Sequence, residues 1–318
     1  MTHPFRFIAP MPRLTEPIAR WRDEVRRIEE LGFSSVSVSE HITHGWTMEP
    51  LTVMTAAATA TERLRVLSLL LTNDFRHPAV LHKAAATIDV LSGGRLELGI
   101  GAGWMADDYA ATGLAFDAPT ERIDRLRESV EVIRLLFGPE PVDYEGRHYR
   151  IAGLEGLPKP VQRPHPPIML GGGGPAMLRL AASVADIVGI HARLPHGSLT
   201  SAEAADLGAE RIDEKVGWVR TAARSAGRDA DSIELQFSVY LVSVSDSRRS
   251  ERATVSSFAE LLRTDPELAA GSPAVLTGSV EACVERLQER RERFGFSYWN
   301  LGGDVDAVAP IVARLAGT

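Results

Sequence analysis

Strand-length apolar runs alternate with segments of helical periodicity along the whole chain, and this alternation constrains the fold more than any other sequence feature. Strands that alternate with helices form parallel sheets, because each helix returns the chain to the start of the next strand. Eight runs have the character of buried strands: Phe5–Ala9, Ser34–Ser39, Leu64–Thr72, Arg95–Gly101, Ile168–Gly171, Asp186–Ile190, Ile233–Val242 and Ser297–Leu301. The pattern predicts an α/β fold, a (β/α)₈ TIM barrel. A doubly wound sheet is the alternative, because periodicity does not reveal closure.

The chain shows no break in composition, so we predict a single barrel domain over residues 1–318. Its rhythm is interrupted between strands four and five, where residues 139–167 contain a short hairpin, Val142–Ile151, and a proline-rich stretch that favours extended backbone. We interpret this segment as an insertion that crosses the top of the barrel. After strand seven, residues 248–278 are expected to hold a helix and an active-site lid.

Charge and cysteine content exclude several classes of protein. With 35 basic and 42 acidic residues, the formal net charge is −7, the wrong sign for neutralising many phosphates, so no nucleic-acid partner is expected. The single cysteine, Cys283, cannot form an internal disulfide or a multi-cysteine metal site. The N-terminus lacks a signal-peptide pattern, and no apolar run reaches the roughly 18 residues of a membrane span. These features predict a cytoplasmic protein.

Functional side chains in a (β/α)₈ barrel lie at the carboxyl ends of the strands. Strand two is followed by Glu40 and His41. Because a histidine proton moves near neutral pH, these two residues are the candidate catalytic pair, and a pair that only stabilises a loop is the alternative. Strand three ends in Thr72 and Asn73, whose polar groups can hydrogen-bond a heterocycle, and Arg76 is either part of that site or a structural clamp.

Two glycine-rich turns are candidate binding loops. Gly101 and Gly103 end strand four and allow a ligand close to the backbone, but position 106 is alanine, so the dinucleotide fingerprint is absent. Strand five ends in four successive glycines, namely Gly171, Gly172, Gly173 and Gly174. They lead into a helix, whose free N–H groups can cradle an anion, and a tight turn that needs positive φ is the alternative. His191 ends strand six and is a weaker candidate for contact with a ring or phosphate.

A catalytic metal is not expected. The spacings His41-x-x-His44 and His77-x₄-His82, with Glu40 nearby, resemble those of metal ligands. Barrel metallohydrolases, however, usually begin with paired histidines on the first strand, which this chain lacks. His82 also falls within a predicted helix, below the rim of the barrel.

Three segments together resemble the luciferase-like monooxygenase family: SVSVSEH, FRHPAVLHKAAATIDVLSGGRLELGIGAGW and PKPVQRPHPPIMLGGGG. The similarity spans roughly residues 5–190, and it is closest to the branch that uses the deazaflavin coenzyme F420. The resemblance implies a (β/α)₈ barrel with a deazaflavin or flavin ring at its mouth. It also implies a homodimer and a non-proline cis peptide behind the ring, at Leu69-Leu70 or a neighbouring bond.

The resemblance also implies roles for single residues. His41 matches a position that often carries an active-site acid or base, Glu40 is its neighbour, and the glycine turn after strand five matches a phosphate-binding loop. Trp104 falls where some relatives have an acidic residue. The predicted cofactor-binding residues are Leu69, Leu70, Thr72, Asn73, Gly101, Gly103, Trp104, Gly171, Gly172, Gly173, Gly174 and His191.

The expected activity is hydride transfer between F420 and a small organic substrate, with His41 handling the proton, because the cofactor supplies hydride chemistry and the protein supplies orientation and protons. One alternative is an FMN-dependent monooxygenase, since reduced flavin reacts with oxygen whereas a deazaflavin largely does not. The other is a barrel that binds a cofactor without catalysis.

Overall fold

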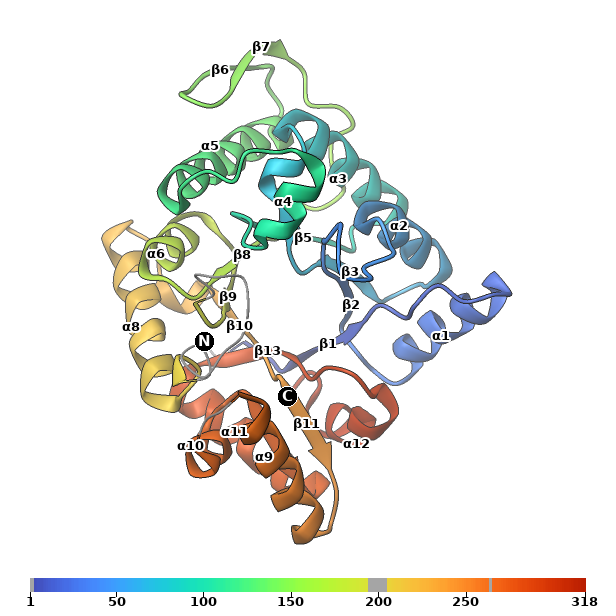
Figure 1. The fold of residues 1–318 in the computed structure, drawn as a ribbon. Helices are drawn as coiled ribbons and strands as arrows, with labels where there is room; N and C mark the ends of the chain where they lie inside the picture. The colour runs from blue at the N-terminus through green and yellow to red at the C-terminus, as the bar shows by residue number, and fades with distance from the viewer. Residues whose placement is uncertain (1–2, 194–204, 263–264) are drawn as a thin grey trace. The chain divides into compact units, whose positions relative to one another are not determined.

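The computed structural model describes residues 3–193, 205–262 and 265–318 (Figure 1). Their contacts divide the chain into two compact units. Unit 1 comprises Met1–Pro10, Arg27–Val36 and Gly171–Thr318, and unit 2 comprises Met11–Arg26 and Ser37–Leu170. The strands of the main sheet pair in parallel within each unit and alternate with helices, so the fold class is the predicted (β/α)₈ barrel rather than a doubly wound sheet. The single domain over residues 1–318 stays a prediction.

Unit 2 holds the elements that follow strand two. Its strands and helices are α2 (Pro50–Ala60), β3 (Arg65–Ser68), β4 (Leu71–Thr72), η1 (Asn73–Phe75), α3 (Pro78–Ser92), β5 (Leu96–Gly101), α4 (Ala106–Thr112), α5 (Pro119–Phe137), β6 (Val142–Glu145) and β7 (Arg150–Leu154). Three boundaries between the units fall within α1 (Ile18–Glu30), β2 (Ser35–Val38) and β8 (Ile168–Gly172), and the fourth follows Pro10. Strand β5 pairs in parallel with β3, β4 and β8.

The expected continuous strand Leu64–Thr72 is wrong in one respect, because the chain forms two short strands. β3 and β4 flank a cis peptide bond between Leu69 and Leu70, the bond that the family resemblance implied. Gly99 on β5 leaves room for the backbone of Ser68 at the end of β3, since a Cβ on Gly99 would lie 1.9 Å from the Ser68 carbonyl oxygen.

The insertion between β5 and β8 contains the predicted hairpin. β6 and β7 pair antiparallel and extend beyond α5 (Figure 1), and their apolar side chains pack on the helix in a cluster of Val132, Leu136, Val142 and Ile151. The proline-rich stretch is held by Asp89 of α3, whose carboxylate accepts hydrogen bonds from the backbone N–H groups of Val161 (2.7 Å) and Gln162 (3.0 Å). A segment that cannot form a ladder thus gains a fixed position through one buried carboxylate.

Unit 1 contains a second set of parallel strands. Its elements are β1 (Arg6–Pro10), α6 (Pro175–Val184), β9 (Ile187–Ile190), α8 (Ala209–Ser225), η2 (Ala230–Ser232), β10 (Glu234–Ser238), β11 (Leu241–Val244), α9 (Arg248–Leu262), α10 (Pro266–Gly271), β12 (Val275–Gly278), α11 (Val280–Phe294), β13 (Phe296–Asn300) and α12 (Val305–Leu315). β13 pairs with β1 and β10, and β10 pairs with β9. Aromatic side chains fill this core, among them Phe7, Phe237 and Trp299.

The expected strand Ile233–Val242 is also two strands. β10 ends at Ser238, and the N–H of Tyr240 donates to Ala274, which directs β11 to a separate parallel pairing with β12. Residues 248–278 thus contain two helices and a strand, and their role as a lid stays a prediction. Among the residues that the structure describes, no helix is both long enough and apolar enough to span a membrane.

Candidate active site

His41, three residues beyond Val38 at the end of β2, forms a buried pair with Asp108 within unit 2. Its Nδ1 lies 2.8 Å from Oδ2 of Asp108, and both side chains are almost fully buried. Asp108 lies in the first turn of α4. Its other oxygen accepts hydrogen bonds from the backbone N–H groups of Ile42 (3.1 Å) and Thr43 (2.9 Å) and from the Thr43 hydroxyl (2.6 Å). One carboxylate therefore fixes both the imidazole ring and the backbone that follows it.

The hydrogen bonds of Asp108 decide its charge. Burial acts to raise the pKa of Asp108, but the bonds from Thr43, His41 and Ile42 outweigh burial and hold the pKa below its usual value. An ionised carboxylate only accepts hydrogen bonds, so Nδ1 of His41 carries a proton, and in the neutral imidazole Nε2 carries the lone pair. Nε2 has no hydrogen-bond partner in the part of the chain that the structure describes. His41 is therefore held in the tautomer of a base.

Two tryptophans flank this imidazole. The ring of Trp46 lies 4.9 Å from that of His41, centroid to centroid, and the ring of Trp104 lies 5.3 Å away in an edge-on arrangement. Both indoles remain partly open to solvent, with exposed fractions of 45% for Trp46 and 37% for Trp104. Trp104, predicted from sequence to bind the cofactor, thus lies against the candidate catalytic histidine.

Glu40 and His41 do not bond each other. Neighbouring residues in extended backbone point to opposite sides, and Glu40 is bound by Arg76. The Arg76 guanidinium donates to both oxygens of Glu40, at 3.0 and 2.5 Å, and the Thr72 N–H donates at 2.8 Å. Glu40 is therefore buried and fully occupied, and Arg76 acts as a clamp between β2 and the end of β4. The catalytic role assigned to Glu40 stays a prediction.

A cavity of about 400 Å³ opens beside His41 within unit 2. It is lined by Glu40, His41, Ile42, Trp46, Thr47, Met48, Glu49, Pro50, Phe75, Arg76, Thr112 and Leu114. A partly apolar cavity with a few convergent polar groups is the usual form of a small-molecule site.

Asn73, directly after β4, carries an unsatisfied acceptor. Its Nδ2 donates to the Tyr149 hydroxyl at 3.3 Å, while its Oδ1 is buried and accepts no hydrogen bond from the residues that the structure describes. A buried acceptor without a donor is costly, so this atom suits a ligand that brings an N–H group. Thr72 is buried beside it, with its own N–H bound to Glu40.

The two glycines at and just beyond the end of β5 differ in how tightly they are surrounded. A Cβ on Gly101 would lie 3.4 Å from Leu70, and a Cβ on Gly103 would lie 1.9 Å from the hydroxyl of Tyr109. Gly103 also has a φ of 76°, which favours glycine. Packing and backbone conformation explain Gly103, whereas a Cβ on Gly101 would make only an ordinary van der Waals contact; the cofactor contact of both glycines stays a prediction.

The four-glycine turn of unit 1 packs beneath the segment that follows β9. A Cβ on Gly173 would lie 2.3 Å from the backbone of Ala192, and a Cβ on Gly171 would lie 3.0 Å from Nε2 of His191. Gly174 is the open position, because its nearest neighbour is the guanidinium Nε of Arg193 at 3.9 Å. Gly174 caps α6 without a side chain, so the first N–H groups of this helix and a cation lie together.

A buried lysine holds the same segment. Lys215 of α8 is fully buried and donates to the His191 carbonyl (2.7 Å) and to the Asp206 carboxylate (2.6 Å). Burial lowers the pKa of Lys215, and burial lowers the pKa of His191 to about 4. His191 is therefore neutral at pH 7, and its ring lies over Gly171.

The model of the luciferase-like monooxygenase family matches residues 3–297, nearly the whole chain. The chain belongs to this family. This luciferase-like chain is 35% identical over 167 residues to an F420-dependent glucose-6-phosphate dehydrogenase of Amycolatopsis mediterranei, which covers 50% of this chain and 49% of the relative. It is 33% identical over 138 residues to an FMNH₂-dependent dimethylsulfone monooxygenase of Pseudomonas putida, with coverages of 43% and 38%. The chain thus spans about half the length of the curated relatives it matches.

Among solved structures, this luciferase-like chain is similar to the monooxygenase RslO1 of Streptomyces bottropensis. The TM-score is 0.74 at 25% sequence identity, and the alignment covers 98% of this chain and 97% of the other. The likeness extends over the full chain, in agreement with the (β/α)₈ barrel.

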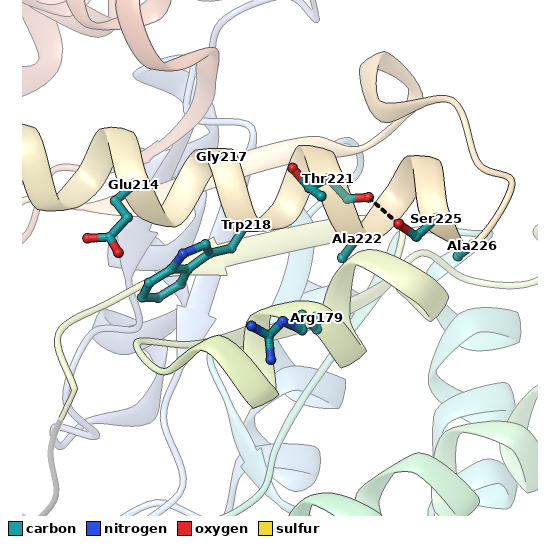
Figure 2. A pocket seen from close by; sticks show the side chains of 8 residues that line it. All are labelled: Arg179, Glu214, Gly217, Trp218, Thr221, Ala222, Ser225 and Ala226. Carbon is teal, nitrogen blue, oxygen red and sulfur yellow. Dashed lines mark hydrogen bonds between the residues drawn. The ribbon is translucent and has the colours of Figure 1, made fainter.

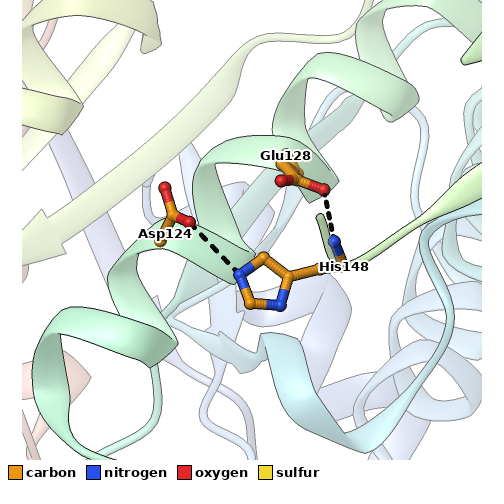
Figure 3. A group of neighbouring side chains, drawn as sticks. All are labelled: Asp124, Glu128 and His148. Atoms are coloured by element: carbon orange, nitrogen blue, oxygen red, sulfur yellow. Dashed lines mark hydrogen bonds and ion pairs between the residues drawn. The ribbon is translucent and has the colours of Figure 1, made fainter. Parts of the chain in front are cut away.

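Three side chains elsewhere in the chain lie close enough together to be tested as metal ligands. Potential ligand atoms of Asp124, Glu128 and His148 lie within 4.8 Å of one another (Figure 3). Glu128, however, accepts hydrogen bonds from the N–H groups of residues 147–149, at 2.9, 2.9 and 3.2 Å, and Asp124 is ion-paired with Arg127 at 2.8 Å. The ligand oxygens are thus already bound to donors, and the cluster fastens the hairpin to α5.

A larger cavity, of about 700 Å³, lies along α6 and α8 of this luciferase-like chain (Figure 2). Trp218, Gly217 and Ala222 of α8 and Arg179 of α6 contribute to its walls. Its one carboxylate, Glu214, is ion-paired with Arg211 of the same helix. The cavity therefore lacks the paired acid and base groups found beside His41.

The histidines with metal-like spacing have separate partners. His44 bonds Asp107 at 2.9 Å through Nε2, and His77 accepts the N–H of Ala79 at 3.2 Å at the start of α3. His82 is buried in α3, and burial lowers its pKa to about 4.

Sequence reasoning missed Asp108 and Trp46, the two residues that most closely surround His41. The acidic pair Asp107-Asp108 in the first turn after the β5 glycines was the available signal for Asp108. An acid at a helix start has an ordinary capping explanation, which conceals its bond to a histidine 67 residues away.

Proposed function

We propose that this chain is an F420-dependent oxidoreductase that transfers hydride to or from a small organic substrate. The observation that carries the proposal is the buried bond between His41 and Asp108 beside an open cavity. It gives the site a proton-handling group of fixed tautomer, placed at the strand ends where barrel enzymes carry their chemistry.

In this proposal, Nε2 of His41 accepts the hydroxyl proton when an alcohol is oxidised, and it returns a proton to the carbonyl oxygen in the reverse direction. A deazaflavin held at this site would supply the hydride chemistry. Asp108 stays ionised and stabilises the imidazolium that forms. The protein residues therefore orient the substrate and move one proton.

Two features of the chain fit such a cofactor. The buried, unsatisfied Oδ1 of Asn73 suits an N–H group of a polar heterocycle. The start of α6 at Gly174, with Arg193 beside it, suits a phosphate. The relative from Amycolatopsis is named as F420-dependent and the one from Pseudomonas as FMNH₂-dependent, so both cofactors have precedent in the family.

The test is a side-by-side fluorescence titration of the protein with oxidised F420 and with FMN. Tenfold tighter binding of F420, about 1.4 kcal/mol, supports the proposal. Tighter binding of FMN favours the monooxygenase alternative, and binding of neither removes the basis of the proposal. Tight F420 binding without turnover of any alcohol or ketone favours the non-catalytic alternative.

The proposal includes a homodimer in the cytoplasm. A buried, unpaired Cys283 is compatible with a reducing compartment, in which thiols persist. Light scattering after size-exclusion chromatography measures the mass in solution, and a monomeric mass would contradict the dimer.

A further inference from the structure

The cavity beside His41 has an apolar character that the proton chemistry does not require. Side chains of Ile42, Trp46 and Leu114 line it, and they leave 53%, 45% and 42% of their surfaces exposed. Met48 and Phe75 extend the same lining. Large apolar side chains that gather at one exposed site mark a place where an apolar partner binds.

The charged side chains that line the cavity are ion-paired with one another. Arg76 donates to both oxygens of Glu40 and lies 3.4 Å from Glu49, while Glu49 also accepts the N–H of Thr52 at the start of α2. The fixed charges of the lining are two carboxylates and one guanidinium. They sum to one negative charge, and the guanidinium is held by both carboxylates.

His41 adds no available positive charge. Its imidazole is bound to the ionised Asp108, so a proton gained at Nε2 is balanced by that carboxylate. An anionic substrate entering this cavity would lose its hydration and meet a net negative wall, which is unfavourable.

We infer that this site takes a neutral, largely apolar alcohol or ketone with a flat ring, held against Trp46, rather than a phosphorylated sugar. The inference rests on the proposed function and names its substrate class. An exposed indole next to the catalytic imidazole offers a face for stacking, and the apolar lining stabilises the ring by burial. The electron balance is that of an alcohol that loses one hydride to the cofactor and one proton to Nε2 of His41, giving the ketone.

The test compares two probes that share a ring and a carbonyl group and differ in charge: 4-methylacetophenone and 4-acetylphenyl phosphate. Binding to the purified protein, with and without F420, is measured by calorimetry and by quenching of tryptophan fluorescence. The neutral ketone is expected to bind at least about tenfold tighter. Equal or tighter binding of the phosphate probe, or no binding of the neutral ketone, overturns the inference.

A charge introduced into the cavity provides the second measurement. Ile42→Arg places an uncommitted cation among the lining side chains and is expected to shift the binding ratio toward the phosphate probe by roughly fivefold. Leu91→Arg is the matched control, because Leu91 is an exposed apolar residue of α3 outside the cavity lining. A ratio that responds equally to both substitutions overturns the inference.

The two proposals fail separately. The titrations with F420 and FMN test the cofactor, whereas the ratio between the probes needs neither turnover nor a bound cofactor. If F420 binds and glucose 6-phosphate is oxidised while the neutral probes fail to bind, the oxidoreductase proposal stands and the substrate class is wrong.

Discussion

Replacement of Asp108 by Asn tests the arrangement of the site most directly. In the native protein, Oδ1 of Asp108 accepts three hydrogen bonds, from the N–H groups of Ile42 and Thr43 and from the Thr43 hydroxyl. An asparagine keeps these bonds by placing its oxygen there, which turns its NH₂ group toward Nδ1 of His41. Two donors cannot bond each other, so the imidazole changes tautomer, with the proton on Nε2.

The magnitude follows from the role of the imidazole. With Nε2 protonated, His41 no longer accepts the substrate proton, and kcat is expected to fall by about 10²–10⁴, the usual contribution of general acid–base catalysis. Stability also falls. Hydrogen bonds to a buried charged acceptor contribute about 1 kcal/mol more than neutral ones, so the four bonds of Asp108 imply a loss of about 4 kcal/mol in the free energy of unfolding.

Nitrogen-15 NMR of the histidine rings reads the tautomer of His41 independently of turnover, and urea unfolding reads the stability. Asp107→Asn is the matched control, since Asp107 is the adjacent residue and makes only an exposed bond to His44. The reasoning is refuted if Asp108→Asn keeps the proton on Nδ1 of His41, or if both variants lower kcat equally.

Three further predictions concern stability and binding. Burial lowers the pKa of His82 to about 4 in the folded state, so the unfolded chain binds a proton first as the pH falls through 6.5. The free energy of unfolding should therefore drop by about 2 kcal/mol between pH 7 and 5. Urea unfolding of His82→Leu should show a smaller dependence of this free energy on pH. Arg76→Met leaves Glu40 buried without its cation and should lower the unfolding free energy by about 3–5 kcal/mol, and an unchanged melting temperature would contradict the clamp. Gly173→Ala should lower the thermal stability and weaken F420 binding at least about tenfold, because its Cβ would overlap the backbone of Ala192. Gly174→Ala has open space around its Cβ and should keep the native stability, so equal thermal stability of the two variants would argue against this packing.

The order of strands was predictable because a buried parallel strand is a nearly continuous apolar run. The point at which one strand ends and the next begins inside such a run was not predictable, because the apolar residues continue across it. Leu69 and Tyr240 both lie in apolar sequence, yet each lies between two strands rather than within one. The cis bond itself was expected only through the family resemblance, since no local pattern specifies it.

Helix α2 was missed for a different reason. Its sequence, PLTVMTAAATA, contains no charged residue, and alanines lie on several sides, so the contrast between an apolar and a polar face is weak. The buried residues Val53, Met54 and Ala57 do follow helical spacing, but small residues elsewhere on the helix conceal it.

The candidate site was half predictable. His41 could be selected as a candidate because functional side chains of a (β/α)₈ barrel lie just after the strands. Asp108 and Arg76 are defined by what they bond, and those bonds join residues 67 and 36 positions apart. Sequence patterns report neighbours along the chain, so they do not show which distant residue Asp108 or Arg76 bonds.

The attachment of the β6–β7 hairpin bears on how fast the chain folds. Glu128 accepts three successive N–H groups that lie only 19 to 21 residues further along the chain, and these bonds are made by a helix and the turn that follows it. Contacts of such short separation need little loop closure, and folding rates fall mainly with the mean separation of contacting residues. Lengthening or shortening the tip of this hairpin would therefore leave the folding rate of the barrel almost unchanged.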